Sequence, residues 1–116
     1  MTQEEKDLLL KDLCARLPYG VKVQTTYINP QTKERKDIGT DVLSTVEISL
    51  LIDGYYEPKP YLFPLENMTE EQKIELTCII DSDYAKFDWY NKNHFDYRGL
   101  IPMGLANDAT GLNIYH

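Results

Sequence analysis

The residues best suited to chemistry lie in one short stretch between Phe87 and Gly99. This stretch holds one of the two histidines and the single tryptophan of the chain. Asp88 and Asn91 are three positions apart, and His94 follows after three more. On a helix their side chains would therefore share one face. A carboxylate, an amide and an imidazole arranged in this way are the groups of an acid–base site.

A structural interpretation of the same stretch competes with the catalytic one, and we favour it. A helix whose aromatic side packs inward and whose polar side faces water needs no further function. Arg98 could bind a carboxylate or a phosphate through two parallel hydrogen bonds. It could equally pair with Asp96 or Asp88 and stack on Tyr97 to hold the tail, which is the role we expect. The candidate interaction or ligand site comprises Asp88, Asn91, His94, Asp96, Tyr97 and Arg98.

The sequence predicts neither a metal nor a cofactor. A zinc site needs three or four ligands, and the second histidine, His116, is far from His94 along the chain. Asp81, Asp83 and Asp88 lack the glycine and the terminal glutamate of a calcium-binding loop. Phosphate-binding loops, nucleophile elbows and dinucleotide-binding glycine patterns are also missing from the sequence. Enzymatic activity is therefore an open but less favoured interpretation.

Composition favours one acidic globular domain over residues 1–116, with 42% hydrophobic residues and a net charge of −7. The longest apolar runs are triplets such as Leu8–Leu10 and Leu50–Ile52, far short of the roughly 20 residues of a membrane span. The N-terminus lacks the basic start and apolar stretch of a secretory signal. We therefore expect a cytoplasmic protein with no membrane partner.

The two cysteines and the charge distribution refine this expectation. Cys14 and Cys78 lack the spacing of a zinc or redox motif, so we predict two reduced, buried core thiols. The overall negative charge opposes binding to nucleic acid. The basic segment 33–36 follows the Asn29–Pro30 turn and is predicted to be a solvated hairpin tip. Whether this segment binds anything stays open.

Caps and periodicity predict the elements of the N-terminal half. Thr2 and Glu5 form a capping box, which begins a helix that carries an apolar stripe of leucines. From residue 21 to 27 the apolar period changes to two, as in a half-buried strand. A second strand is predicted from about Val42 to Ile52, and residues 32–38 are a candidate short edge strand.

The C-terminal half is predicted to be mainly helical. The proline-rich stretch 55–65 is expected to be extended without forming a central strand, because proline supplies no amide to a ladder. Thr69 and Gln72 form a second capping box, so a helix should run over 69–80. A third helix begins after Ser82 or Asp83. Trp89 and Tyr97 are expected to be at least partly buried. The tail from residue 96 is irregular, with one short helical turn near residue 100.

Several strings of the C-terminal half resemble a known group of proteins. They are Lys59–Gln72, Asp88–Asn91, His94–Ile101 and Gly104–Ala106. In these strings the chain resembles small uncharacterised proteins of gut Bacteroidetes, many of them encoded near prophages or other mobile elements. The resemblance implies an origin and an intracellular setting, and it carries no biochemical activity. The basic insert 31–37 is particular to this chain.

We therefore predict a single α+β domain with an N-terminal helix, a small antiparallel sheet over 21–54, two C-terminal helices and an irregular tail. The favoured function is a non-catalytic protein-interaction or accessory module, in the setting of a mobile element, that binds an unknown protein partner. The alternative is a small enzyme or ligand-binding protein with a site around Asp88, His94, Asp96 and Arg98. A pocket where these four residues converge would favour the alternative, and a flat surface with exposed tyrosines would favour the interaction module.

Overall fold

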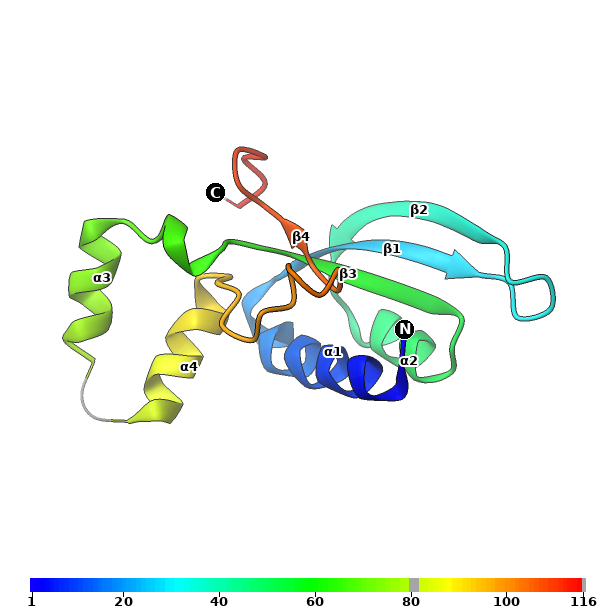
Figure 1. The fold of residues 1–116 in the computed structure, drawn as a ribbon, viewed down its shortest axis with the longest axis horizontal. Helices are drawn as coiled ribbons and strands as arrows, with labels where there is room; N and C mark the ends of the chain where they lie inside the picture. Colours follow the sequence, from blue (N-terminus) through cyan, green and yellow to red (C-terminus); the bar gives the residue numbers. More distant parts are fainter. Residues whose placement is uncertain (80–81, 116) are drawn as a thin grey trace.

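The computed structural model describes residues 1–79 and 82–115. It has an α+β fold, as predicted, in which α1 and α2 lie on one side of a four-stranded sheet and two further helices project at one end (Figure 1). The elements are α1 (Gln3–Arg16), η1 (Leu17–Tyr19), β1 (Lys22–Ile28), β2 (Arg35–Val42), α2 (Thr45–Ile52), β3 (Tyr56–Leu62), η2 (Leu65–Asn67), α3 (Glu70–Thr77), α4 (Asp83–Lys92) and β4 (Asn107–Asp108). No helix in the described part of the chain is both long enough and apolar enough to cross a membrane.

The first helix, α1, forms as predicted and supplies one layer of the core. The Thr2 hydroxyl accepts from the Glu5 amide while the Glu5 carboxylate accepts from the Thr2 amide. Leu9 and Leu13 are buried on the face that packs against the sheet. The same core cluster includes Val21, Val23, Leu43, Leu51, Leu62, Leu100, Leu105 and Ala106.

The sheet has the strand order β2-β1-β3-β4 and is antiparallel except at its last pair. Val23 lies opposite Pro60 of β3, and Thr25 lies opposite Pro58. All four residues are buried, so they define the face that packs on the helices. The last part of the tail, after β4, lies on the other side of the sheet (Figure 1). There the Tyr115 hydroxyl accepts from the Lys22 amide and donates to the Tyr61 carbonyl at 2.7 Å.

The predicted strand from Val42 to Ile52 is wrong, because most of this segment is helix α2. Ser44 and Glu47 form a capping box of the same kind as the other two. The alternation of apolar residues suggested a strand, but the residues that face the core are Ile48 and Leu51, which lie one helical turn apart.

The second strand is instead β2, which contains most of the candidate edge strand 32–38. All eight of its residues are exposed, and it forms one edge of the sheet. Ile38 is skipped in the pairing with β1, so it forms a bulge. The Leu43 amide donates to the Val21 carbonyl of the β1 side, which turns the preceding Val42 amide outward. That amide donates to the Asp41 carboxylate at 2.7 Å.

The proline-rich segment also differs from its prediction, because β3 lies inside the sheet between β1 and β4. The ladder accommodates the prolines through its register. The Ile28 amide donates to the Tyr55 carbonyl, so the odd-numbered residues of β3 bond to β1 in this antiparallel pair. Pro58 and Pro60 occupy the even positions, where the backbone nitrogen points away from β1. No ladder hydrogen bond to β1 is therefore lost.

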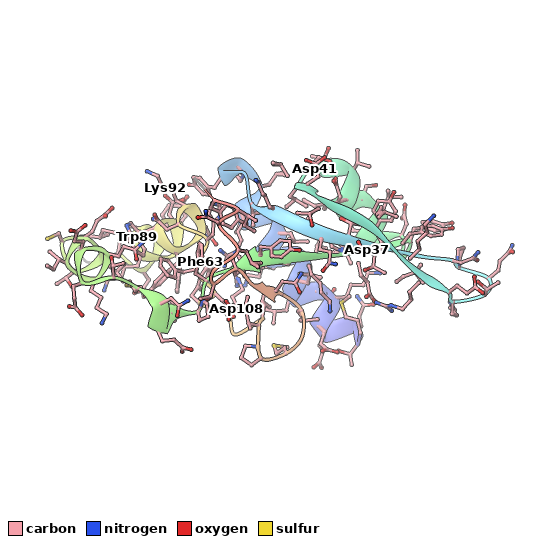
Figure 2. All side chains as sticks on the ribbon, turned by 90° about the horizontal axis from the view of Figure 1, so that it is seen from above. Asp37, Asp41, Phe63, Trp89, Lys92 and Asp108 are labelled. Carbon is pink, nitrogen blue, oxygen red and sulfur yellow. The ribbon has the colours of Figure 1, made fainter. Side chains whose placement is uncertain are left out.

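The two C-terminal helices form as predicted and project from the body. We call η2, α3 and α4 together the arm, meaning the described residues 65–79 and 82–92. Thr69 and Gln72 cap α3, and Ser82 caps α4. Trp89 and Tyr97 are buried and half-buried, as expected, and Figure 2 shows Trp89 on the arm and Phe63 where the arm joins the sheet. The predicted helix end at Ile80, as well as Asp81 and His116, lies outside the described residues.

The tail after residue 96 is a series of turns that includes the short strand β4 and continues beyond it to residue 115. The expected helical turn near Leu100 is replaced by turns in which the Leu105 amide donates to the Leu100 carbonyl at 2.9 Å. Both leucines are buried. The tail is therefore part of the core.

The prediction that the cysteines are buried is wrong, although both thiols are free. Cys14 is exposed because the buried face of α1 is formed by Leu9, Leu13 and Arg16. Cys78 is exposed because it caps the C-terminus of α3, a helix with no buried residue.

Candidate functional site

A buried group of charges joins α1 to the tail. The Arg16 Nε atom donates to Asp12 Oδ2 at 2.8 Å, and the Arg98 Nε atom donates to Asp12 Oδ1 at 3.1 Å. Arg16 also donates to the Phe95 carbonyl at 2.7 Å. Asp12 and Arg16 are fully buried, and the Arg98 side chain is 17% exposed. Arg98 therefore pairs with an aspartate and anchors the tail, as expected, but its partner is Asp12, and the predicted pairing with Asp96 or Asp88 is wrong.

Tyr97 packs between the two guanidinium groups of this cluster. The Arg16 Cζ atom lies 5.4 Å from the Tyr97 ring centroid, and the Arg98 Cζ atom lies 4.8 Å away. The Tyr97 ring also stacks on Phe87 and Tyr90 of α4. Cations over an aromatic face are stabilised by the ring quadrupole, so Tyr97 helps to compensate for the second positive charge.

Asp96 is used by the backbone of the tail. Its carboxylate accepts from the Leu100 and Ile101 amides, each at 2.9 Å. The Asp96 amide donates to the Phe63 carbonyl at 2.9 Å. Because the carboxylate is buried and engaged by two amides, it holds a turn and is not available as a general base.

His94 occupies an unusual backbone conformation just after α4. Its φ angle is +62°, a left-handed value that few residues other than glycine adopt. Its ring stacks on Tyr115 with centroids 3.8 Å apart. Burial and, secondarily, the positive charge of Arg16 lower the pKa of His94 to about 4. The imidazole is therefore neutral near pH 7.

Asp88 and Asn91 do not join His94 on one helical face, because α4 ends at Lys92. Asp88 accepts a hydrogen bond from the Tyr19 hydroxyl, and this bond raises the pKa of Tyr19. Asn91 is buried. Tyr97 and Arg98 therefore act together in the buried charge cluster, whereas Asp88, His94 and Asp96 each make a different structural contact.

The open pockets confirm this separation. His94 borders a pocket of about 400 Å³ that is lined by Tyr19, Gly20, Lys22, Ile114 and Tyr115. Asp96 borders a different pocket of about 280 Å³, and Asp88 and Arg98 line neither. Within residues 1–79 and 82–115, no group of three or more His, Cys, Asp or Glu side chains could hold a metal ion.

The sequence interpretation missed Asp12 and Arg16, the most deeply buried charged residues. Their spacing of four positions on a helix was a usable signal, since such pairs face each other. Their position on the same face as Leu9 and Leu13 pointed to burial. The partner Arg98, by contrast, lies 86 residues from Asp12 along the chain.

The arm carries exposed apolar side chains that the sequence did not predict, and others lie on β2 and α2, among them Val46. Ile74 of α3 is 64% exposed, and Tyr84 and Phe87 of α4 are 81% and 48% exposed. Trp89 Nε1 donates to the Glu75 carboxylate at 3.0 Å and so links the two helices. Trp89 stacks on Phe95 with an interplanar angle of 5°, which anchors α4 to the body. The chain matches no protein-family model, no curated protein and no solved structure.

Proposed function

We propose that this protein is a non-catalytic interaction module and that the arm binds a protein partner. The observation that carries the proposal is α3, an eight-residue helix with no buried residue. Helices shorter than about 12 residues are marginal in water without tertiary packing. A partner that covered α3 would supply the packing that the body of the protein does not.

The exposed side chains of the arm suit this role. Large apolar residues at the centre of an interface contribute most of its binding energy, and tyrosine is enriched among them. Tyr84 and Phe87 are three positions apart on α4, so they share a face of that helix. Ile74 adds an aliphatic side chain from α3.

The polar residues favour this proposal over an enzyme. Asp12, Asp96 and Arg98 are held by internal hydrogen bonds, and the neutral His94 borders a pocket that none of these three residues lines. The charged residues that an acid–base site would need are therefore already used in contacts that stabilise the fold. Placing the partner in a host or in a mobile element rests on the resemblance of the C-terminal strings alone.

The proposal is tested by capture of a partner from the native cell with matched variants. Ile74→Asp places a charge on the arm, whereas Val46→Asp places the same charge on α2 at a residue that is 59% exposed. We expect one protein to be retained by the parent and by Val46→Asp, and to be lost with Ile74→Asp and with Tyr84→Ala. Purified components should reproduce this order of affinity.

Two results would overturn the proposal. One is a partner that Ile74→Asp and Tyr84→Ala bind as strongly as the parent does. The other is a partner that is lost only with Val46→Asp, since this would place the interface on α2. Circular dichroism of each variant verifies that the fold is retained.

A further inference from the structure

We infer that the segment that docks on the arm is basic and carries apolar side chains. This inference rests on the proposed function and specifies the class of partner. It follows from the charge of the arm and from a pocket at its base.

The arm is acidic along its length. Within its described residues six acids stand against three lysines, for a net charge of 3 − 6 = −3. The acids are Glu66, Glu70, Glu71, Glu75, Asp83 and Asp88, and the bases are Lys73, Lys86 and Lys92. Only Glu70 forms an ion pair in the described part of the arm, with Lys73 at 3.2 Å. Glu75 and Asp88 accept hydrogen bonds from Trp89 and Tyr19. The exposed carboxylates left for an external cation are Glu66, Glu71 and Asp83.

The pocket at the base of the arm combines an apolar wall with carboxylates. Pro64 and Leu65 lie on the arm side, and Ile101 and Pro102 lie on the tail side. Glu66, Asp96 and Asp108 also line this space of about 280 Å³. Lysine and arginine have an apolar stem and a charged head. One such side chain could therefore contact both the apolar wall and the carboxylates of this pocket. Asp96 and Asp108 already accept hydrogen bonds from residues of the tail. Glu66 is therefore the exposed carboxylate of this pocket that is left for a ligand.

The charges argue against a second copy as the occupant of the arm. Two arms of charge −3 would repel each other at close range. The hairpin that carries segment 33–36 lies at the opposite end of the molecule (Figure 1), so it could meet the arm of a second copy only head to tail. Its free positive charge is small, because Arg35 already pairs with Glu57 and Glu34 lies among its bases. A basic segment of a different protein fits the arm better.

The test uses a fluorescent synthetic helical peptide of leucine and lysine, beside the same peptide with glutamate in place of lysine. Anisotropy should show binding of the lysine peptide alone, weakened by added salt. Glu66→Lys and Glu71→Lys should each raise Kd about fivefold, as expected for reversing one contact charge. Glu4→Lys is the matched control, because Glu4 and Glu71 are both the second residue of a helix that begins with a capping box.

Three results would overturn the inference: no binding of the lysine peptide, equal binding of the glutamate peptide, or equal weakening by Glu4→Lys. Light scattering provides a further check, since a dimer that Ile74→Asp dissociates would make a second copy the occupant. The two proposals can fail separately. A captured partner that depends on the arm but docks an acidic segment would refute this inference and leave the proposed function intact.

Discussion

Asp12 binds two guanidinium groups in the interior, and each of its oxygens accepts one hydrogen bond. Removing one member of a buried ion pair leaves an uncompensated charge and costs about 3 to 5 kcal/mol. We therefore expect Asp12→Asn to lower the free energy of unfolding by about that amount. Arg98→Ala should cost about 1.5 to 3 kcal/mol, the range for a charge-assisted hydrogen bond. Urea unfolding followed by circular dichroism measures both.

The stability of the Arg98→Ala variant decides whether Arg98 is a structural residue. Arg98→Ala with parental stability would mean that Arg98 does not anchor the tail, and it would return this residue to the candidate ligand site. In that case a metabolite thermal-shift screen of parent and variant would show a ligand that stabilises only the parent.

His94 makes the stability of the protein depend on pH. Its pKa falls from 6.5 to about 4 on folding, mainly because of burial. A depressed pKa in the folded state means that the contribution to stability is fully present above pH 6.5 and is lost as the pH falls toward 4. We expect His94→Asn to lose less stability than the parent between these pH values. Asparagine is chosen because it tolerates the left-handed backbone.

Thermal unfolding of both proteins at several pH values gives the measurement. The carboxylates titrate in both proteins, so the difference between the two curves isolates the histidine. Parallel curves would show that the imidazole is equally solvated in the folded and unfolded chains.

The arm helix α3 and the body helix α1 differ in how many of their residues are buried. α1 buries four residues, whereas α3 buries none. Local opening is easiest where few apolar contacts are lost. We expect the amides of α3 to exchange with solvent hydrogen fastest among the helices of the isolated protein, and those of α1 slowest. Hydrogen exchange followed by NMR resolves the two helices, and equal protection would contradict the assignment of α3 as unpacked.

Helix ends were the most predictable features of the fold. The capping boxes at Thr2 and Thr69 located α1 and α3, because a cap depends only on residues three positions apart. The same signal at Ser44 marks α2, but alternating apolar residues suggested a strand there. The choice between the two depended on which residues meet the sheet, and Leu51 meets it one turn after Ile48. Such tertiary contacts cannot be inferred from the spacing of neighbouring residues in the sequence.

The candidate site was predictable only in part, for a related reason. The expectation that Arg98 holds the tail through an aspartate and stacks on Tyr97 was correct, but the expected partners, Asp96 and Asp88, were wrong. The partner of Arg98 is Asp12, which comes from the first helix. The exposed arm was unpredictable, because amphipathic helices such as α3 normally bury their apolar side.

The whole molecule is elongated, with principal extents of 51, 28 and 23 Å. The arm lies at one end of the long axis and the β1–β2 hairpin at the other (Figure 1). A compact chain of this length has a radius of gyration of about 13 Å, whereas the value here is 14.8 Å. Small-angle X-ray scattering should give a radius at or slightly above 14.8 Å. A value near 13 Å would mean that the arm folds back onto the body.

The two edge strands of the sheet affect how the protein behaves at high concentration. Unpaired strand edges recruit strands from other chains and so start aggregation. At one edge the short β4 pairs only with Tyr61 and Leu62, and the uncovered part of β3 offers no amide at Pro58 and Pro60. At the other edge β2 has a bulge at Ile38 and a Val42 amide already bonded to Asp41. Neither edge therefore presents the regular row of donors that an amyloid-like stack needs. We therefore expect neither edge to start strand-paired aggregation when the protein is concentrated.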